Sequence, residues 1–265
     1  MNNFNVIRCG GVHERAGSLA FSRRWKGTLW IEWTSVIYST TKYANKQIDI
    51  KKISTSLFSD LSGKMFTFPQ QTKTAHVRLT TTKQEFSAIT VCHRSITDLQ
   101  RGHVLFSMAI SSNSNVFLIF WDHENKEMEP HIKDTKSEIM GLNYKSNMWH
   151  SICTTWDSTT GLAQLWFDGQ RSIKKFVNSG TPIRGSTVIV LGQEQDSHGG
   201  GFDLMQSFVG MMSDVHMWDY VLSPCEIQKY VDGLNFTPGN ALNWSALEFL
   251  ITDRVLIEDK QESCV

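Results

Sequence analysis

The sequence predicts an all-β protein, a two-sheet antiparallel sandwich of the jelly-roll (lectin-like) type with one short helix. Three observations support this fold class. From about residue 64, short runs of β-branched and aromatic residues alternate with polar ones, and each run ends at Gly, Asn, Asp or Ser, which is typical of antiparallel strands. One Asp-Gly pair joins two such runs, and one helical segment carries clear end signals. Many strands with few helices favour a sandwich over β–α–β units.

Seven segments carry the clearest strand pattern. In chain order they are His76 to Thr80, Ala88 to Arg94, Val104 to Ala109, Val116 to Trp121, His150 to Trp156, Ala163 to Phe167 and Thr187 to Leu191. Asp168-Gly169 follows the sixth strand, and a type I′ turn needs positive φ at both of its central residues, which this pair tolerates. We therefore expect a tight hairpin at this point.

One helix is expected over residues 224 to 232. Ser223 can cap it, Pro224 suits the first helical position, and Glu226 can complete a Ser-x-x-Glu capping box. Gly233 can end it.

Composition excludes several classes of protein. The 265 residues are 40% hydrophobic and 20% charged, as in ordinary folded domains. Lys and Arg total 26 and Asp and Glu total 26, so no overall field favours nucleic acid. No apolar run approaches the roughly 18 residues of a transmembrane span.

The charge is nevertheless divided unevenly along the chain. Residues 1–60 contain nine basic and four acidic residues, which suggests a segment different in kind from the rest. We expect residues 1–60 to be an unassigned N-terminal segment, disordered or absent from the mature protein, without a convincing signal peptide. Residues 61–265 then form one domain.

An acidic loop follows the last predicted strand. Glu194 and Asp196 are two residues apart and share a face of an extended chain. Asp203 and Gln206 follow a run of glycines that lets the chain fold back. Ca²⁺ takes six to eight oxygen ligands from such groups. On spacing alone, a solvated acidic loop explains the pattern equally well.

Paired carboxylates on a jelly roll also suggest a glycosidase, in which two of them stand about 5 to 5.5 Å apart in retaining enzymes. A further acid would be expected a few residues later, where Ser197, His198 and Gly199 stand. We therefore do not expect an enzyme.

Several motifs resemble one family. The segment His150-Ser-Ile-Cys153-Thr-Thr-Trp156-Asp-Ser158 is similar to the His-x-Cys-x-Ser/Thr-Trp-x-Ser/Thr signature of the pentraxins. Further similar segments are Leu191 to Ser197, Ser207 to Gly210, Met217 to Pro224 and Leu242 to Leu247. The resemblance runs from about Leu61 to about Ile257. It implies a flattened jelly roll and a secreted, calcium-dependent pattern-recognition protein of innate immunity and the acute phase that assembles into a homo-oligomeric ring, typically of five.

The resemblance implies two Ca²⁺ ions per subunit. Their matching ligands are Asn115, Glu194, Gln195 through its backbone carbonyl, Asp196, Asp203 and Gln206. Ser114 stands where the family has Asp, which removes one charged ligand and is expected to weaken binding. A structural or interaction protein with an impaired calcium site is therefore an alternative.

The resemblance also implies a headgroup pocket. Phe120 and Glu138 match the residues that receive the choline of phosphocholine in the family, and Lys133 matches a small residue lining that pocket. The expected ligands are phosphocholine, phosphoethanolamine or acidic saccharides on microbes or damaged cells.

The remaining expectations concern cysteines and two polar residues. Cys92 and Cys153 match the family's intrachain disulfide, which implies an oxidising compartment. Cys9, Cys225 and Cys264 are free thiols, or Cys264 bridges two chains.

Asp168 matches a residue through which the family recruits the complement recognition protein, although its place in the hairpin turn also explains it. His150 is expected to be a packing residue.

Overall fold

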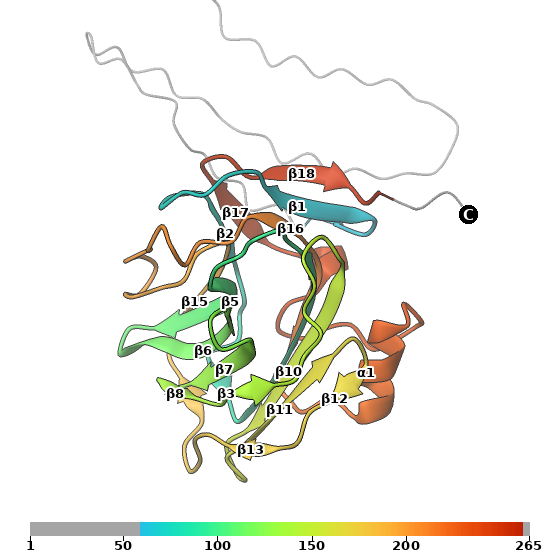
Figure 1. Ribbon diagram of the computed structural model, residues 1–265. Helices are drawn as coiled ribbons and strands as arrows, with labels where there is room; N and C mark the ends of the chain where they lie inside the picture. Colours follow the sequence, from blue (N-terminus) through green and yellow to red (C-terminus); the bar gives the residue numbers. More distant parts are fainter. Residues whose placement is uncertain (1–58, 262–265) are drawn as a thin grey trace, which may run out of the picture. The chain divides into compact units, whose positions relative to one another are not determined.

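Residues 59–261 are described by a computed structural model, and they form two antiparallel sheets packed face to face (Figure 1). Sheet 1 contains, in spatial order, β12 (Gln170–Arg171), β11 (Leu162–Phe167), β10 (His150–Asp157), β4 (Ala88–Ile96), β16 (Gly210–Trp218), β1 (Lys64–Phe68) and β18 (Leu256–Asp259), with β13 (Lys175–Phe176) paired to β11. Sheet 2 contains β17 (Phe249–Thr252), β2 (His76–Leu79), β15 (Thr187–Leu191), β5 (His103–Ile110), β6 (Asn113–Asp122), β7 (Glu127–Ile132) and β8 (Thr135–Lys136), with β9 (Ile139–Met140) paired to β7. A separate ribbon pairs β3 (Glu85–Phe86) with β14 (Ile183–Arg184). The predicted fold class is confirmed.

The main core lies between the two sheets. Ile89 and Trp156 of sheet 1 and Phe106 and Phe117 of sheet 2 are all fully buried in one hydrophobic cluster. Because side chains alternate between the faces of a strand, each of these strands also presents residues to the outer face of its sheet. All seven predicted strands are present, with ends shifted by a few residues.

The predicted hairpin and helix are also present. Asp168 and Gly169 have φ values of 47° and 79°, as the expected turn requires. The helix α1 spans Pro224–Val231, and the Ser223 hydroxyl accepts a hydrogen bond from the backbone of Glu226. The Glu226 carboxylate does not complete the capping box as expected, because it accepts from the backbone of Thr237 and from Lys229. A short 3₁₀ helix, Trp244–Ala246, lies near β16.

A second cluster lies on the outer face of sheet 1, where α1 packs. Cys92 and Cys153 stand opposite each other on β4 and β10 and form the expected disulfide, 61 residues apart in sequence. Trp218 and the α1 residues Ile227 and Tyr230 are buried against it. The disulfide therefore joins two adjacent central strands directly beneath the helix.

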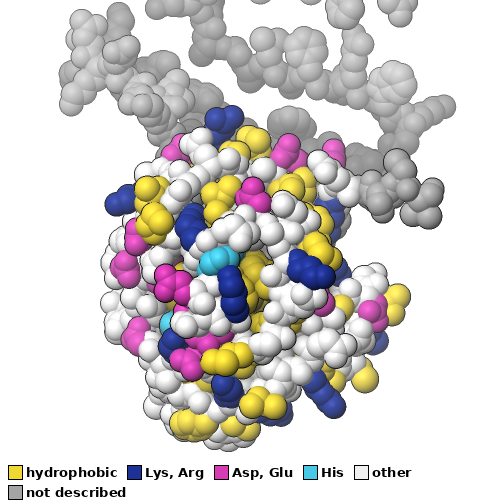
Figure 2. Space-filling model, in the orientation of Figure 1, with side chains coloured by type: hydrophobic (Ala, Val, Ile, Leu, Met, Phe, Trp, Pro, Cys, Tyr) yellow, Lys and Arg dark blue, Asp and Glu magenta, His cyan; other side chains and the backbone are white. Residues whose placement is uncertain are grey.

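The surface over the visible face mixes acidic and basic side chains (Figure 2), in keeping with the zero formal charge. Among residues 59–261, no helix is long and apolar enough to cross a membrane. The expectations for residues 1–58, and those for Cys9 and Cys264, lie outside the described residues. Cys225 is exposed and unpaired.

Candidate calcium site

The acidic loop, residues 192–206, folds back over the outer face of sheet 2. Val188 and Val190 of β15 are buried outside the main core, whereas Ile189 and Leu191 belong to it. The amide nitrogen of the Gln195 side chain donates to the backbone carbonyls of Ser107 and Val188, at 3.2 and 3.1 Å. The Gln195 side chain therefore fastens the loop to β5 and β15.

Two glycines allow this path. Gly192 has a φ of +92°, and a Cβ there would lie 2.4 Å from the Phe68 ring. Gly201 has a φ of +77°, and a Cβ there would lie 2.8 Å from the Cβ of Asp196. Residues with a Cβ rarely adopt this backbone conformation, so both positions require glycine. The second brings the returning chain against Asp196.

Glu194 is a buried carboxylate of the loop that lies close to two other carboxylates. Its residue is only 3% exposed, and Oε2 has no hydrogen-bond partner among the described residues. Burial, and then the charges of Asp196 and Asp203, raise the pKa of Glu194 to about 7. The three predicted carboxylates are thus brought together closely enough to repel one another. A bound cation would relieve this repulsion.

Without metal, the free energy of unfolding is expected to fall as the pH rises from about 5 to about 8, because of Glu194. Its pKa is about 7 in the folded protein against an ordinary 4.5, so the folded state binds more protons between these values. The contribution is fully present below the unfolded pKa and is lost as the pH rises through the folded one, with a slope of at most about 1.4 kcal/mol per pH unit. Urea titrations in chelator at several pH values should show a steeper fall for the wild type than for Glu194→Gln. Equal slopes would contradict the assignment.

Asp203 and Gln206 form the returning turn. The backbone N–H of Gln206 donates to the Asp203 carbonyl, and the Gln206 carbonyl accepts from the backbone of Val104 on β5. Arg101 donates to the Met205 carbonyl at 2.6 Å and so holds the same turn. Arg101 was not identified from the sequence.

Asn115 lies near the start of β6, which is paired to β5. Its Oδ1 is buried and has no hydrogen-bond partner among the described residues. Ser114, where the family has Asp, is half-buried beside it. Two predicted calcium ligands, Asn115 and Glu194, therefore each carry a buried oxygen without a partner.

The three predicted headgroup residues have different surroundings. Phe120 on β6 is half-buried and pairs with Glu129 on β7. Val104, also paired with Phe120, bonds to Gln206, so Phe120 adjoins the candidate calcium site. Lys133 lies in the turn that follows β7, where its backbone N–H donates to the carbonyl of Val116, four residues before Phe120 on β6.

Lys133 sits in the tight turn between β7 and β8. It has a φ of 49°, and its ammonium donates to the carbonyl and hydroxyl of Thr181, both at 2.6 Å. It also lies 5.7 Å from the centre of the Trp156 ring.

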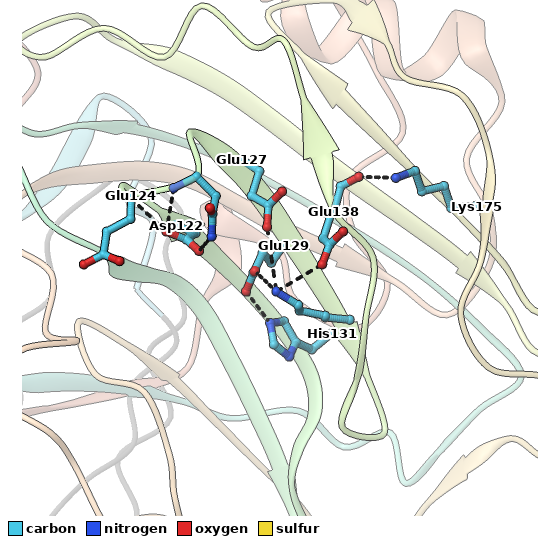
Figure 3. A network of polar contacts seen from close by, with 9 residues as sticks. Asp122, Glu124, Glu127, Glu129, His131, Glu138 and Lys175 are labelled. Carbon is cyan, nitrogen blue, oxygen red and sulfur yellow. Dashed lines mark hydrogen bonds and ion pairs between the residues drawn. The ribbon is translucent and has the colours of Figure 1, made fainter.

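Glu138 belongs to a carboxylate network on the outer face of sheet 2 (Figure 3). The Lys136 ammonium binds Glu129 and lies 3.3 Å from Glu138 and 3.7 Å from Glu127. Hydrogen bonding to Glu129 raises the pKa of Lys136. Burial, and then Glu129 and Glu138, raise the pKa of Glu127. Phe120 is therefore paired with a residue of this network, Glu129, whose carboxylate binds the Lys136 ammonium.

Asp168 and His150 interact with each other. His150 Nδ1 lies 2.7 Å from the Asp168 carboxylate, which also accepts from the backbone of Ser151. His150 Nε2 lies 3.0 Å from the backbone nitrogen and 3.1 Å from the carbonyl oxygen of Lys145, so both ring nitrogens have polar neighbours. His150 is thus a buried anchor, and Asp168 has a structural role in the hairpin.

Comparisons with known proteins identify the family of the chain. A model of the Pentaxin family matches residues 64–259. The chain is 40% identical over 202 residues to serum amyloid P-component of Sus scrofa, covering 76% of this chain and 89% of that protein. It is 37% identical over 201 residues to C-reactive protein of Sus scrofa, with the same coverage.

A solved structure shares the fold. The heptameric SAP-like pentraxin of Limulus polyphemus superposes with a TM-score of 0.69 at 24% identity, covering 76% of this chain and 96% of that one. The family model covers most of the chain, and the curated relatives match along nearly their whole length. The chain therefore belongs to the pentaxin family.

Proposed function

We propose that this protein is a secreted recognition protein that uses Ca²⁺ to bind phosphocholine- or phosphoethanolamine-type headgroups, or acidic saccharides, on microbes or damaged cells. The carrying observation is that Glu194 Oε2 and Asn115 Oδ1 are both buried without partners. Burying such groups unpaired is costly, and oxygen donors of this kind suit Ca²⁺.

The donor set fits the family's pair of calcium ions. The proposed ligands are Asn115, Glu194, the backbone carbonyl of Gln195, Asp196, Asp203 and Gln206. When bound, calcium supplies positive charge that the carboxylates only partly neutralise, and this charge attracts an anionic oxygen of a ligand. The Gln195 side chain is used entirely within the protein, which leaves its carbonyl as the ligating group.

The proposed headgroup position extends from Gln206 across Phe120 towards Glu129. An aromatic face and nearby carboxylates favour a cationic group. The carboxylates of Glu129 and Glu138 already contact the Lys136 ammonium, so a compact primary ammonium can share them more readily than the bulkier choline. We accordingly propose that phosphoethanolamine is preferred.

Chromatography tests this function. The protein is passed in millimolar calcium over immobilised phosphoethanolamine and phosphocholine, and then treated with a chelator. Retention that the chelator reverses supports the proposal, and the stronger column identifies the preferred headgroup. If neither column retains the protein although calcium raises the melting temperature, the proposed headgroups are wrong and the search moves to acidic saccharides.

Ser114 favours one second candidate, an interaction protein with an impaired calcium site. Serine supplies a neutral oxygen where the family has a carboxylate, so affinity would be lower. A melting temperature unchanged by millimolar calcium would support this alternative.

The proposed contact between Asp168 and a complement protein remains a prediction. His150 and Ser151 already engage that carboxylate.

The two opposite edges of sheet 1 are proposed to join copies of the chain head to tail into a ring. At one edge, Ile173 and Phe176 are 72% and 67% exposed, next to the exposed Lys174. At the other edge, Leu256 and Ile257 are 42% and 44% exposed, followed on β18 by Glu258 and Asp259. Apolar surface of opposite charge at opposite edges favours a heterologous contact, which closes into a ring at a suitable angle.

Replacing either Ile173 or Leu256 by Asp is expected to convert the assembly to monomers, because each change puts a charge into an apolar contact. Light scattering coupled to size-exclusion chromatography measures the mass. Leu234→Asp is the matched control, since Leu234 is 59% exposed at the end of α1, and it should leave the assembly intact. An unchanged mass for both edge variants would refute the proposed contact.

A further inference from the structure

Three carboxylates converge where β6 and β7 meet at their hairpin. Asp122, the last residue of β6, pairs with Glu127, the first residue of β7, and Glu129 follows two residues later on the same face. One oxygen from each lies within 4.8 Å of the others. Figure 3 shows the three side chains drawn from the two neighbouring strands. We call them the hairpin triad.

The spacing of the triad suits a single hard cation. Calcium binds oxygen at 2.3–2.6 Å, so two of its ligands stand at most about 5 Å apart. The three oxygens of the triad satisfy this limit. They provide only part of a coordination shell, and the half-buried position of Asp122 leaves room for water to complete it.

The burial of Glu127 points independently to a ligand. Its side chain is only 2% exposed, and its Oε2 has no hydrogen-bond partner among the described residues. Its nearest cation is the Lys136 ammonium, 3.7 Å from the other oxygen, Oε1. A buried carboxylate oxygen without a partner is unfavourable. This oxygen belongs to a residue of the triad, where a cation would satisfy it.

The charges of the network do not balance. The triad and Glu138 contribute four carboxylates, against which Lys136 is the ammonium in contact. His131 Nε2 lies 3.0 Å from the Glu129 carboxylate, and even with this ring counted as a cation the carboxylates outnumber the positive groups. No ion pair of the described residues reaches Asp122. An excess of negative charge therefore remains on the Asp122 and Glu127 side of the network.

We propose that the hairpin triad of Asp122, Glu127 and Glu129 is a binding site for a divalent cation, with Ca²⁺ as the ion, separate from the site formed by residues 192–206. The site joins β6 to β7 at the hairpin. Binding there places a second positive charge beside Glu129, the residue paired with Phe120, and so weakens the hold of the carboxylates on Lys136. The triad thus supplies a cation-dependent control of the surface beside the proposed headgroup position.

The test first removes the loop site. In a Glu194→Gln/Asp196→Asn background of the full chain, isothermal titration with CaCl₂ alone reports only binding elsewhere. We expect one remaining calcium equivalent per chain. Adding Glu127→Gln should weaken it at least tenfold, since the amide keeps the shape of the side chain and removes its charge. Adding Glu124→Gln, a matched change of an exposed carboxylate in the same hairpin, should leave the affinity unchanged.

This test can refute the hairpin site without bearing on the proposed function, and the reverse also holds. If the background variant melts cooperatively but binds no calcium, or if its binding survives both Glu127→Gln and Glu129→Gln, the hairpin site is refuted. Loss of headgroup retention in the background variant concerns only the loop site. The melting curve of each glutamine variant is compared with that of the background variant. A misfolded protein is thereby distinguished from a folded protein that no longer binds calcium.

Discussion

Replacing Glu194 by glutamine is expected to abolish calcium-dependent retention on the headgroup columns and to remove the share of the calcium-induced rise in stability that comes from the loop site. Glu194 has a buried oxygen without a partner, and two other carboxylates raise its pKa to about 7. The substitution removes the charge at the centre of the loop and keeps its shape. At a calcium concentration 100 times the Kd of the loop site, that site should contribute about 2.7 kcal/mol in the wild type, and the variant should keep only the contribution of the hairpin triad. Thermal melts with and without calcium measure this difference.

The matched control for this experiment is Glu248→Gln, a partly exposed carboxylate just before β17. It should retain both the calcium response and the column binding. In chelator, Glu194→Gln should be as stable as the wild type or more stable near pH 8, because the ionised Glu194 is unfavourable there. A variant that keeps the full calcium response of the wild type would mean that Glu194 is not a ligand.

Removal of the Cys92–Cys153 disulfide by Cys92→Ala/Cys153→Ala is expected to lower the free energy of unfolding by about 4 kcal/mol. The bond closes a loop between residues 61 apart, and in the chain-entropy account a loop of this length gives a value of that size. The cysteines are also fully buried beneath α1, so truncation leaves space beside Trp218. Urea denaturation measures the change.

Cys225→Ala provides the control for the disulfide experiment. Cys225 is exposed and unpaired, so the change should alter stability by less than about 0.5 kcal/mol. A reductant should destabilise the wild type and the Cys225 variant alike. If the double variant loses less than about 1 kcal/mol, the bond does not constrain the unfolded chain in the manner proposed.

The sequence predicts the fold where the pattern is local. The alternation in β10 and β15, the Asp168-Gly169 turn and the Ser223 cap each depend on a few adjacent residues. Strand β16 was not predicted, because its register shifts between Ser213 and His216, which interrupts the alternation. The edge strand β18 was also missed, since all four of its residues are exposed and no apolar face marks it.

The candidate site could be predicted from sequence only in part. The acidic loop is visible because its carboxylates are close together in the chain. The network around Lys136 is not, because it depends on the pairing of β7 with both β8 and β9. The alternation of Glu127, Glu129 and His131 was nevertheless a usable signal, since residues two apart share a face. The contact of Lys133 with Thr181 depends on the two-residue turn between β7 and β8, which a motif comparison without strand register does not resolve.

The hydrogen bonds of the Gln195 side chain determine how the acidic loop responds to destabilising substitutions in the core of the sandwich. Its amide bonds to two strands of sheet 2, and its carbonyl oxygen accepts from the backbone of Gly199. The first half of the loop is thereby fastened to the sheet through Gln195, and local opening would require these buried bonds to break without compensation. Loop and sandwich should therefore behave as one cooperative unit. Core substitutions would then lower the fraction of competent molecules, while each folded molecule keeps its full affinity.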